Sequence, residues 1–158
     1  MSVVADELYS LLVPLGRDRL VVPRSCVAEV IRYMAPAAEE PGDSWYRGKT
    51  KWNNRSIPVI SFERMCDIEP PPASGRTRVV VFHPLGGVAD CPPYGLLSEG
   101  FPQMVKVNRE VVVLDETYTP SPDVPLICRI NMLKEFAMVP DLEMIEQKLA
   151  AELSATIA

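Results

Sequence analysis

Few residues in this sequence have the type and spacing that catalysis requires. His83 is the only histidine, and its place between a strand-like run and Pro84 predicts a structural role at a strand end. A phosphorylated histidine is the alternative, but it would normally lie on a helix face of a four-helix bundle. Nucleophilic catalysis needs a Ser or Cys with a base in reach, and nothing around His83 resembles a nucleophile elbow. We therefore predict no catalytic residue and no enzymatic activity.

The cysteines and carboxylates do not form a metal site in the sequence pattern. A zinc site needs two close cysteine pairs, or cysteines with several histidines. Neighbouring residues such as Asp115-Glu116 point to opposite sides of a strand and make a poor metal clamp. We predict no metal, no cofactor and four reduced, buried thiols. The widely spaced cysteines, none of them in a CxxC pair, are Cys26, Cys66, Cys91 and Cys128.

Composition excludes further classes of function. The 158 residues suit one domain, and the net charge is −5 with no run of Lys and Arg. Nucleic-acid binding is not expected, because phosphate neutralisation needs a basic surface. The start MSVVADELYS lacks a positive region followed by an apolar one, and no window approaches the length of a spanning helix, so a cytoplasmic location is expected.

Short runs rich in β-branched residues and broken by turn signals predict an all-β domain with appended helices. A short helix is expected over Arg24–Tyr33, because Val27, Val30 and Ile31 repeat at i, i+3 and i+4. A loop is expected over Ala35–Ser44. The expected strands are Leu8–Pro14, Leu20–Val22, Trp45–Lys51, Ser56–Phe62, Thr77–Phe82, Tyr94–Ser98, Gln103–Val107, Val111–Leu114 and Leu126–Met132.

The clearest helix signal follows Pro140. Asp141 is a suitable N-cap, and the apolar residues Leu142, Ile145, Leu149 and Leu153 form a stripe at helical spacing. We predict a helix over 141–155 that packs this stripe on the core of its own domain. The alternative is that the stripe is offered to a partner protein.

Asn53-Asn54 separates two predicted strands and predicts the turn of a tight hairpin, because Asn tolerates the left-handed conformation. Ile57, Val59 and Ile60 supply the buried side of the second strand. Pro58 removes one backbone donor and suggests an edge strand or a bulge. The proline-rich stretch Asp67–Gly75 divides the chain into two halves that each begin with a hairpin. This pattern predicts two small barrels side by side, over residues 8–67 and 76–140.

Two stretches, taken in order, resemble the CheW-like coupling proteins of bacterial chemosensory pathways. In Gly48–Phe62 (GKTKWNNRSIPVISF), Gly48 and the run Ile57–Ile60 match the family's Gly and its Ile-Pro-Val-Ile strand. In Tyr94–Val107 (YGLLSEGFPQMVKV), the run Gly95–Leu97 matches the family's Gly-Leu strand. The resemblance covers roughly residues 8–140. It implies a single CheW-like domain of two SH3-like barrel subdomains.

The resemblance also implies function. The chain is similar to non-enzymatic adaptors. These adaptors join the cytoplasmic tip of a chemoreceptor to a CheA-type histidine kinase, in chemotaxis or in type IV pilus twitching motility. Asn53-Asn54 stands where the family has an Arg-Gly turn, Ser61 where it has Asp, and Ser98-Glu99 where it has Val-Asp. The implied partner-binding residues are Asn53, Asn54, Ile57, Val59 and Ile60. A neutral amide in place of a guanidinium predicts changed contacts at the turn, although Asn-Asn could instead simply close the hairpin.

Two other classes of function are kept beside the adaptor. One is a structural or regulatory interaction module outside chemosensing, and the other is a small enzyme, which the missing catalytic set disfavours.

Overall fold

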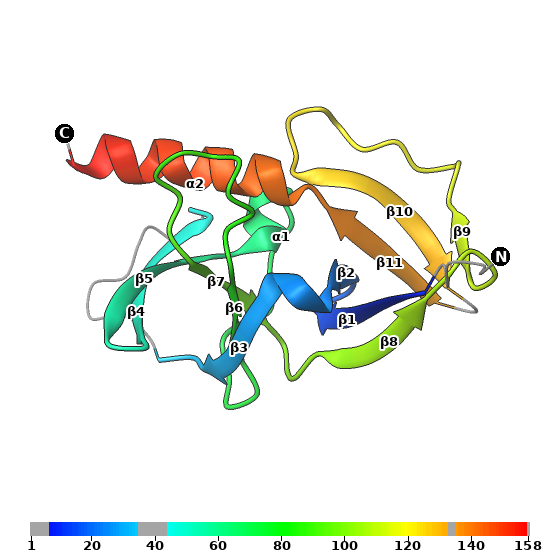
Figure 1. Ribbon diagram of the computed structural model, residues 1–158, viewed down its shortest axis with the longest axis horizontal. Helices are drawn as coiled ribbons and strands as arrows, with labels where there is room; N and C mark the ends of the chain where they lie inside the picture. Colours follow the sequence, from blue (N-terminus) through cyan, green and yellow to red (C-terminus); the bar gives the residue numbers. More distant parts are fainter. Residues whose placement is uncertain (1–6, 35–43, 133–134, 158) are drawn as a thin grey trace, which may run out of the picture.

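The computed structural model describes residues 7–34, 44–132 and 135–157 (Figure 1). The predicted loop Ala35–Ser44 lies almost wholly outside the described residues. Strands dominate the described part, and two α-helices and one 3-10 turn accompany them, so the predicted class, all-β with appended helices, is confirmed. The strands are β1 (Leu8–Pro14), β2 (Arg19–Pro23), β3 (Val27–Arg32), β4 (Tyr46–Trp52), β5 (Arg55–Ile60), β6 (Arg78–Phe82), β7 (Tyr94–Ser98), β8 (Gln103–Val107), β9 (Val112–Leu114), β10 (Leu126–Met132) and β11 (Glu135–Pro140). The helices are α1 (Phe62–Met65) and α2 (Leu142–Ile157), and the 3-10 turn is η1 (Arg24–Cys26).

The strands form two curled sheets that lie side by side (Figure 1). The first sheet has the order β8-β1-β2-β11-β10-β9, and the second has the order β3-β6-β7-β5-β4. Most neighbours are antiparallel, but β2 with β11 and β5 with β7 are parallel pairs. Each sheet takes strands from both halves of the chain. The sheets therefore do not follow the expected sequential division into 8–67 and 76–140, because the second half supplies the strands that complete both of them.

The central strands of each sheet are buried on both faces, which explains why β2 and β6 are apolar at consecutive positions. In β6, Val79 and Val81 face an apolar cluster enclosed by the second sheet, while Val80 and Phe82 face a larger core shared with the first sheet. In β2, Val21 faces a cluster enclosed by the first sheet. Side chains of successive strand residues point to opposite faces, so these runs alternate between an inner cluster and the shared core.

Helix α2 lies across the shared core, as the stripe predicted. Asp141 accepts a hydrogen bond from the backbone N–H of Met144 at 3.0 Å and caps the first turn. Ile145 and Leu149 are fully buried in the shared core, and Leu142 and Leu153 pack at its border. In Figure 1 the helix crosses from the end of β11 over the second sheet. The packing of the stripe on its own domain is confirmed.

The predicted helix over Arg24–Tyr33 is wrong. Only Arg24–Cys26 is helical, as a 3-10 turn, and Val27–Arg32 is strand β3. Val30 and Ile31 pair with Val80 and Val79 of β6. The same spacing that suits a helix also places these side chains beside a distant strand, and β-branched residues fit a sheet well. The pairing partner, which is far away in sequence, decides the conformation.

Two further details differ from the expectation. Strand β11 was not among the expected strands, and it fills the place between β2 and β10. Strand β5, which contains Pro58, lies between β7 and β4 and is not an edge strand. The irregularity suggested by Pro58 is nevertheless present in its partner: β4 carries one extra residue between Tyr46 and Lys49. Gly48 adopts a φ of 89° there, a conformation that glycine tolerates best.

Candidate partner-binding surface

The β4–β5 hairpin carries the residues that the sequence singled out for partner contact. Trp52 pairs with Arg55, so Asn53 and Asn54 are the two residues of the turn. Their φ angles are 52° and 62°, and both side chains are exposed. Left-handed conformations at both central residues define the hairpin turn whose twist matches that of the strands. The predicted turn is confirmed, and its role in binding stays a prediction.

The apolar part of the predicted site is buried. Ile57 and Ile60 are 0% exposed and Val59 is 2% exposed. Ile57 lies in the inner cluster of the second sheet, and Val59 and Ile60 pair with Gly95 and Leu96 of β7. In the folded chain these three side chains are therefore not exposed to a partner, and their part in binding stays a prediction. These residues hold the base of the hairpin in the sheet and thereby position its exposed tip.

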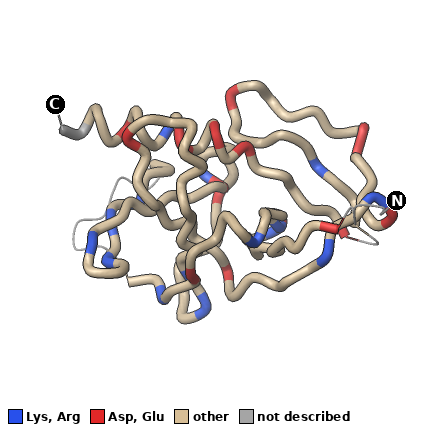
Figure 2. The backbone as a smooth tube through the Cα atoms, in the orientation of Figure 1, with Lys and Arg blue, Asp and Glu red and all other residues tan. Residues whose placement is uncertain are grey.

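Basic residues gather on this hairpin, although the sequence contains no basic run. Lys49, Lys51 and Arg55 are exposed on β4 and β5, and Figure 2 shows the blue Lys and Arg positions concentrated there. Strand alternation separates these residues along the chain, and hairpin pairing brings them together. Sequence reasoning missed the cluster because it searched for contiguous charge. The hairpin is a locally positive surface on a protein of net charge −5.

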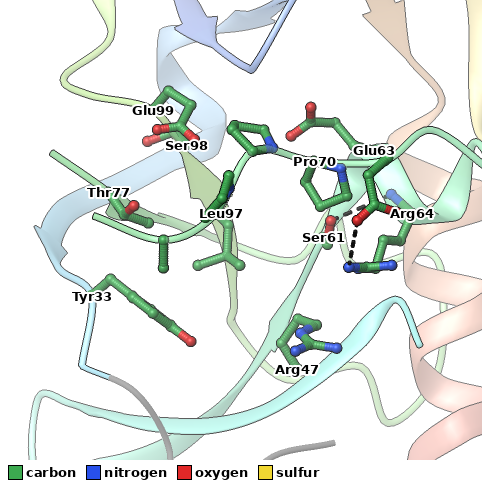
Figure 3. A pocket seen from close by; sticks show the side chains of 14 residues that line it. Tyr33, Arg47, Ser61, Glu63, Arg64, Pro70, Thr77, Leu97, Ser98 and Glu99 are labelled. Carbon is green, nitrogen blue, oxygen red and sulfur yellow. Dashed lines mark hydrogen bonds and ion pairs between the residues drawn. The ribbon is translucent and has the colours of Figure 1, made fainter. Parts of the chain in front are cut away.

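A hollow of about 460 Å³ lies near the base of the hairpin, beside the proline-rich segment Pro70–Pro72 (Figure 3). Glu63 accepts a hydrogen bond from the N–H of Gly16 at 3.2 Å, and Arg64 forms an ion pair with Glu69 at 3.6 Å. Ser61 accepts a hydrogen bond from the N–H of Arg64 and caps α1. Ser61 thus performs the capping for which Asp is equally suited.

Two other buried polar groups of the hollow also bind backbone. The Thr77 hydroxyl accepts from the N–H of Ser74 at 2.9 Å, and the Ser98 hydroxyl donates to the carbonyl of Gly100 at 2.9 Å. These contacts fix the loops that enclose the hollow. Burial raises the pKa of Glu63, and the N–H of Gly16 partly opposes that effect. The polar groups described here therefore hold the loops around the hollow in place.

The four cysteines are free thiols with little nucleophilic character. Burial raises the pKa of Cys66 and of Cys91 to about 11 in each case, and acidic neighbours add to the effect. Burial also raises the pKa of Cys26 and Cys128. Since the thiolate is the reactive form, these thiols are protonated and unreactive near neutral pH. Their partial burial agrees with the expected role of small apolar residues.

Glu146 of α2 is a buried carboxylate that the sequence analysis did not single out. Its side chain is 0% exposed, and one carboxylate oxygen accepts a hydrogen bond from the N–H of Leu85 at 2.7 Å. Burial raises the pKa of Glu146. The contact ties the loop between β6 and β7 to the helix. Glu146 follows the buried Ile145 and interrupts the apolar stripe. This acidic residue beside the stripe is the one sequence signal that could have indicated a buried carboxylate.

Two kinds of feature are absent from the described ranges 7–34, 44–132 and 135–157. Within them, no three or more His, Cys, Asp or Glu side chains are grouped so that they could hold a metal ion. No helix in the same ranges is long and apolar enough to cross a membrane.

The two sheets curl around separate apolar clusters and share a third core, which helix α2 covers. This arrangement defines a small β domain. The family model for the CheW-like domain matches residues 10–146. The chain therefore belongs to the CheW-like domain family.

Among solved structures, the scaffolding protein TtCheW from Thermoanaerobacter tengcongensis has a similar fold, with a TM-score of 0.67 and 14% sequence identity. The similarity covers 85% of this chain and 84% of that one. A comparison with curated protein sequences found no match.

Proposed function

We propose that this chain is a non-enzymatic adaptor that links chemoreceptors to a CheA-type histidine kinase in bacterial chemosensory signalling, of the chemotaxis or the twitching-motility type. The observation that carries the proposal is the CheW-like family match over residues 10–146. The fold likeness to a protein described as scaffolding supports it. The raised pKa values of Cys66 and Cys91 disfavour nucleophilic chemistry at these two thiols.

An adaptor needs two separate contact surfaces, and the two sheets supply candidates at their outer ends. On the second sheet the candidate is the hairpin tip with Asn53 and Asn54. On the first sheet, Val113 of β9 and Phe136 of β11 both lie opposite Asn131 of β10 and are 63% and 47% exposed. The guanidinium carbon of Arg129 lies 4.2 Å from the ring centroid of Phe136. Arg129 is partly exposed beside these residues, and aromatic and arginine side chains are enriched at protein interfaces.

Co-purification from the source organism tests the adaptor role. The tagged chain should capture a chemoreceptor and a histidine kinase together, identified by mass spectrometry. A regulatory module outside chemosensing would capture neither. Deleting the gene should impair either swimming chemotaxis or twitching, and the impaired movement identifies the pathway.

The turn is tested by comparing Asn53→Ala and Asn53→Arg proteins in titrations with the captured kinase and receptor at two salt concentrations. A neutral amide contact contributes about 0.5–1.5 kcal/mol net, so alanine should weaken binding by a few fold. Arginine should make binding stronger and more sensitive to salt. Gln103→Ala, an exposed amide on the first sheet, is the matched control. If both Asn53 variants fold and bind like the parent, the turn serves only to close the hairpin.

A further inference from the structure

Among the described residues, the two outer strands of the second sheet face one another across a slot. Strands β3 and β4 are its outer strands, and within the described residues neither pairs with the other. The slot has a volume of about 670 Å³. Unpaired strand edges offer backbone donors and acceptors to an added strand. The residues that line the slot are Glu29, Ile31, Arg32 and Met34 on one side, and Lys49, Thr50, Lys51, Trp52 and Asn53 on the other.

The β3 side of the slot opens toward the inside of the sheet. Glu29 and Ile31 pair with Val81 and Val79 of β6. Both valines are 0% exposed and belong to the inner apolar cluster. Because paired residues share a face, Glu29 and Ile31 lie on the face of β3 that carries this cluster, although the Glu29 side chain is itself exposed. Ile31 packs against the cluster and forms an apolar part of the slot floor.

The β4 side completes the floor. Thr50 pairs with Ile57, which is 0% exposed in the same inner cluster. Trp52 lies two residues further along β4, so it shares the face of Thr50, and its ring packs against the cluster. The indole N–H of Trp52 donates to the carboxylate of Glu29 at 2.9 Å. This bond links the two edges through side chains and leaves the backbones apart.

The rim of the slot is basic. Lys49 and Lys51 alternate with Thr50 and Trp52, so they point to the opposite, outer face of β4, and both are exposed. Arg32 of β3 is also exposed. Glu29 is the one carboxylate among the described residues that line the slot, and it is engaged by Trp52. An apolar floor and a cationic rim thus lie one residue apart along the same strand edge.

We propose that this slot binds an extended segment of a partner protein in which acidic and apolar residues alternate, added as a strand along the edge of β4. Its outward acidic side chains meet Lys49 and Lys51, and its inward apolar side chains cover Trp52 and Ile31. Main-chain hydrogen bonds supply affinity and alternate side chains supply specificity in this mode of recognition. A second copy of this chain is a poorer occupant, because pairing two β4 edges places lysines against lysines.

The inference goes beyond the proposed adaptor function. It rests on the register of the second sheet and the charges at its edge. A failure of receptor–kinase coupling would leave it standing, and its own failure would leave the adaptor role untouched.

The test uses a fluorescent synthetic peptide of alternating Glu and Val, about six residues long to match a typical strand. A second peptide has the same composition with the Glu residues grouped together. Fluorescence anisotropy with the full chain should show binding of the alternating peptide, weakened by salt. The Lys49→Glu/Lys51→Glu protein should bind about tenfold more weakly or worse, because two attractions become repulsions.

The matched control is the Lys106→Glu/Lys148→Glu protein, which changes the charge equally but away from the slot and should bind like the parent. Hydrogen exchange on the parent should show slower exchange of β4 backbone amides when the alternating peptide is bound. Circular dichroism checks the fold of each variant.

Three results would overturn the proposal. One is the absence of binding at low salt. Another is equal binding of the grouped peptide with no slowing of β4 amides, which would indicate charge attraction alone. The third is a dimer of the parent, seen by light scattering and lost in the Lys49→Glu/Lys51→Glu protein, which would make a second copy the occupant.

Discussion

Replacing Gly95 by alanine should destabilise the protein through one buried contact. Gly95 lies in β7, opposite Val81 of β6 and beside Val59 of β5. A Cβ atom at this position would lie 2.3 Å from Cγ1 of Val79 and 3.6 Å from Cγ2 of Val59. The distance of 3.6 Å to Val59 is an ordinary van der Waals contact, whereas the distance of 2.3 Å to Val79 is far shorter than such a contact. The physical need for glycine here is therefore the close approach of the Val79 side chain.

The cost follows from how little Val79 can yield. Its side chain is 0% exposed in the inner cluster of the second sheet, and a β-branched residue has few χ1 alternatives. Overpacking of this kind costs about 1–3 kcal/mol. Val79→Ala alone should cost about 2 kcal/mol, since it removes buried methyl groups worth about 0.8 kcal/mol each and leaves a cavity.

The double variant Gly95→Ala/Val79→Ala removes the clashing atom. Its stability should therefore lie close to that of Val79→Ala alone, which corresponds to a favourable coupling of about 1–3 kcal/mol. Urea unfolding followed by circular dichroism gives the four free energies of the cycle. If the two single effects add to within about 0.5 kcal/mol, the contact with Val79 is not the reason for glycine at this position.

The remaining predictions concern α2 and the hairpin. Leu149→Asp should lower the free energy of unfolding by about 2–5 kcal/mol, because it buries an unpaired charge, whereas Ala151→Asp on the exposed side of α2 should cost less than about 1 kcal/mol; an unchanged melting temperature for Leu149→Asp would contradict the packing of the stripe. Burial raises the pKa of Glu146 in the folded state, so the folded chain holds this proton more tightly than the unfolded chain does. The contribution of Glu146 to the free energy of unfolding therefore falls as the pH rises from the unfolded-state pKa through the folded-state pKa. Glu146→Gln, which keeps an acceptor for Leu85, should lose that part of the pH dependence in urea titrations at several pH values, and parallel curves for parent and variant would refute the assignment. Asn54→Val should cost roughly 1–2 kcal/mol, because a β-branched residue resists the left-handed conformation, while Asn54→Gly should be neutral or stabilising; equal thermal melts for the two variants would argue against the observed turn.

Much of the fold could be predicted from local patterns. The run Arg78–Phe82, rich in β-branched residues, forms strand β6, which is buried on both faces of its sheet. Asn53-Asn54 could be recognised as a turn, because few residues tolerate two consecutive left-handed conformations. The stripe after Pro140 predicted α2 and its packing, since an amphipathic helix beside a β domain has an apolar core available to it.

Features set by distant partners could not be predicted. Val27–Arg32 has spacing compatible with both a helix and a strand, and its pairing with β6 decides the outcome. The parallel pair of β2 with β11 joins the two ends of the chain, and no local signal encodes it. For this reason the sheets cross the expected boundary near the proline-rich segment.

The candidate site divides in the same way. The exposed turn was placed correctly, because turn chemistry is local. Ile57, Val59 and Ile60 were predicted as contacts but are buried, since an apolar run does not tell whether it faces a partner or the interior. The basic rim at Lys49 and Lys51 exists only once the hairpin has formed and its alternate side chains share a face.

The central claim, that the chain joins a receptor to a kinase, is tested most directly by co-sedimentation of purified components. Membranes that contain the chemoreceptor are mixed with the CheA-type kinase, with and without the chain, and then pelleted. The account predicts that the chain pellets with the receptor and raises the amount of kinase in the pellet in a saturable manner. Kinase that pellets to the same extent without the chain, or a chain that stays in the supernatant, would contradict it.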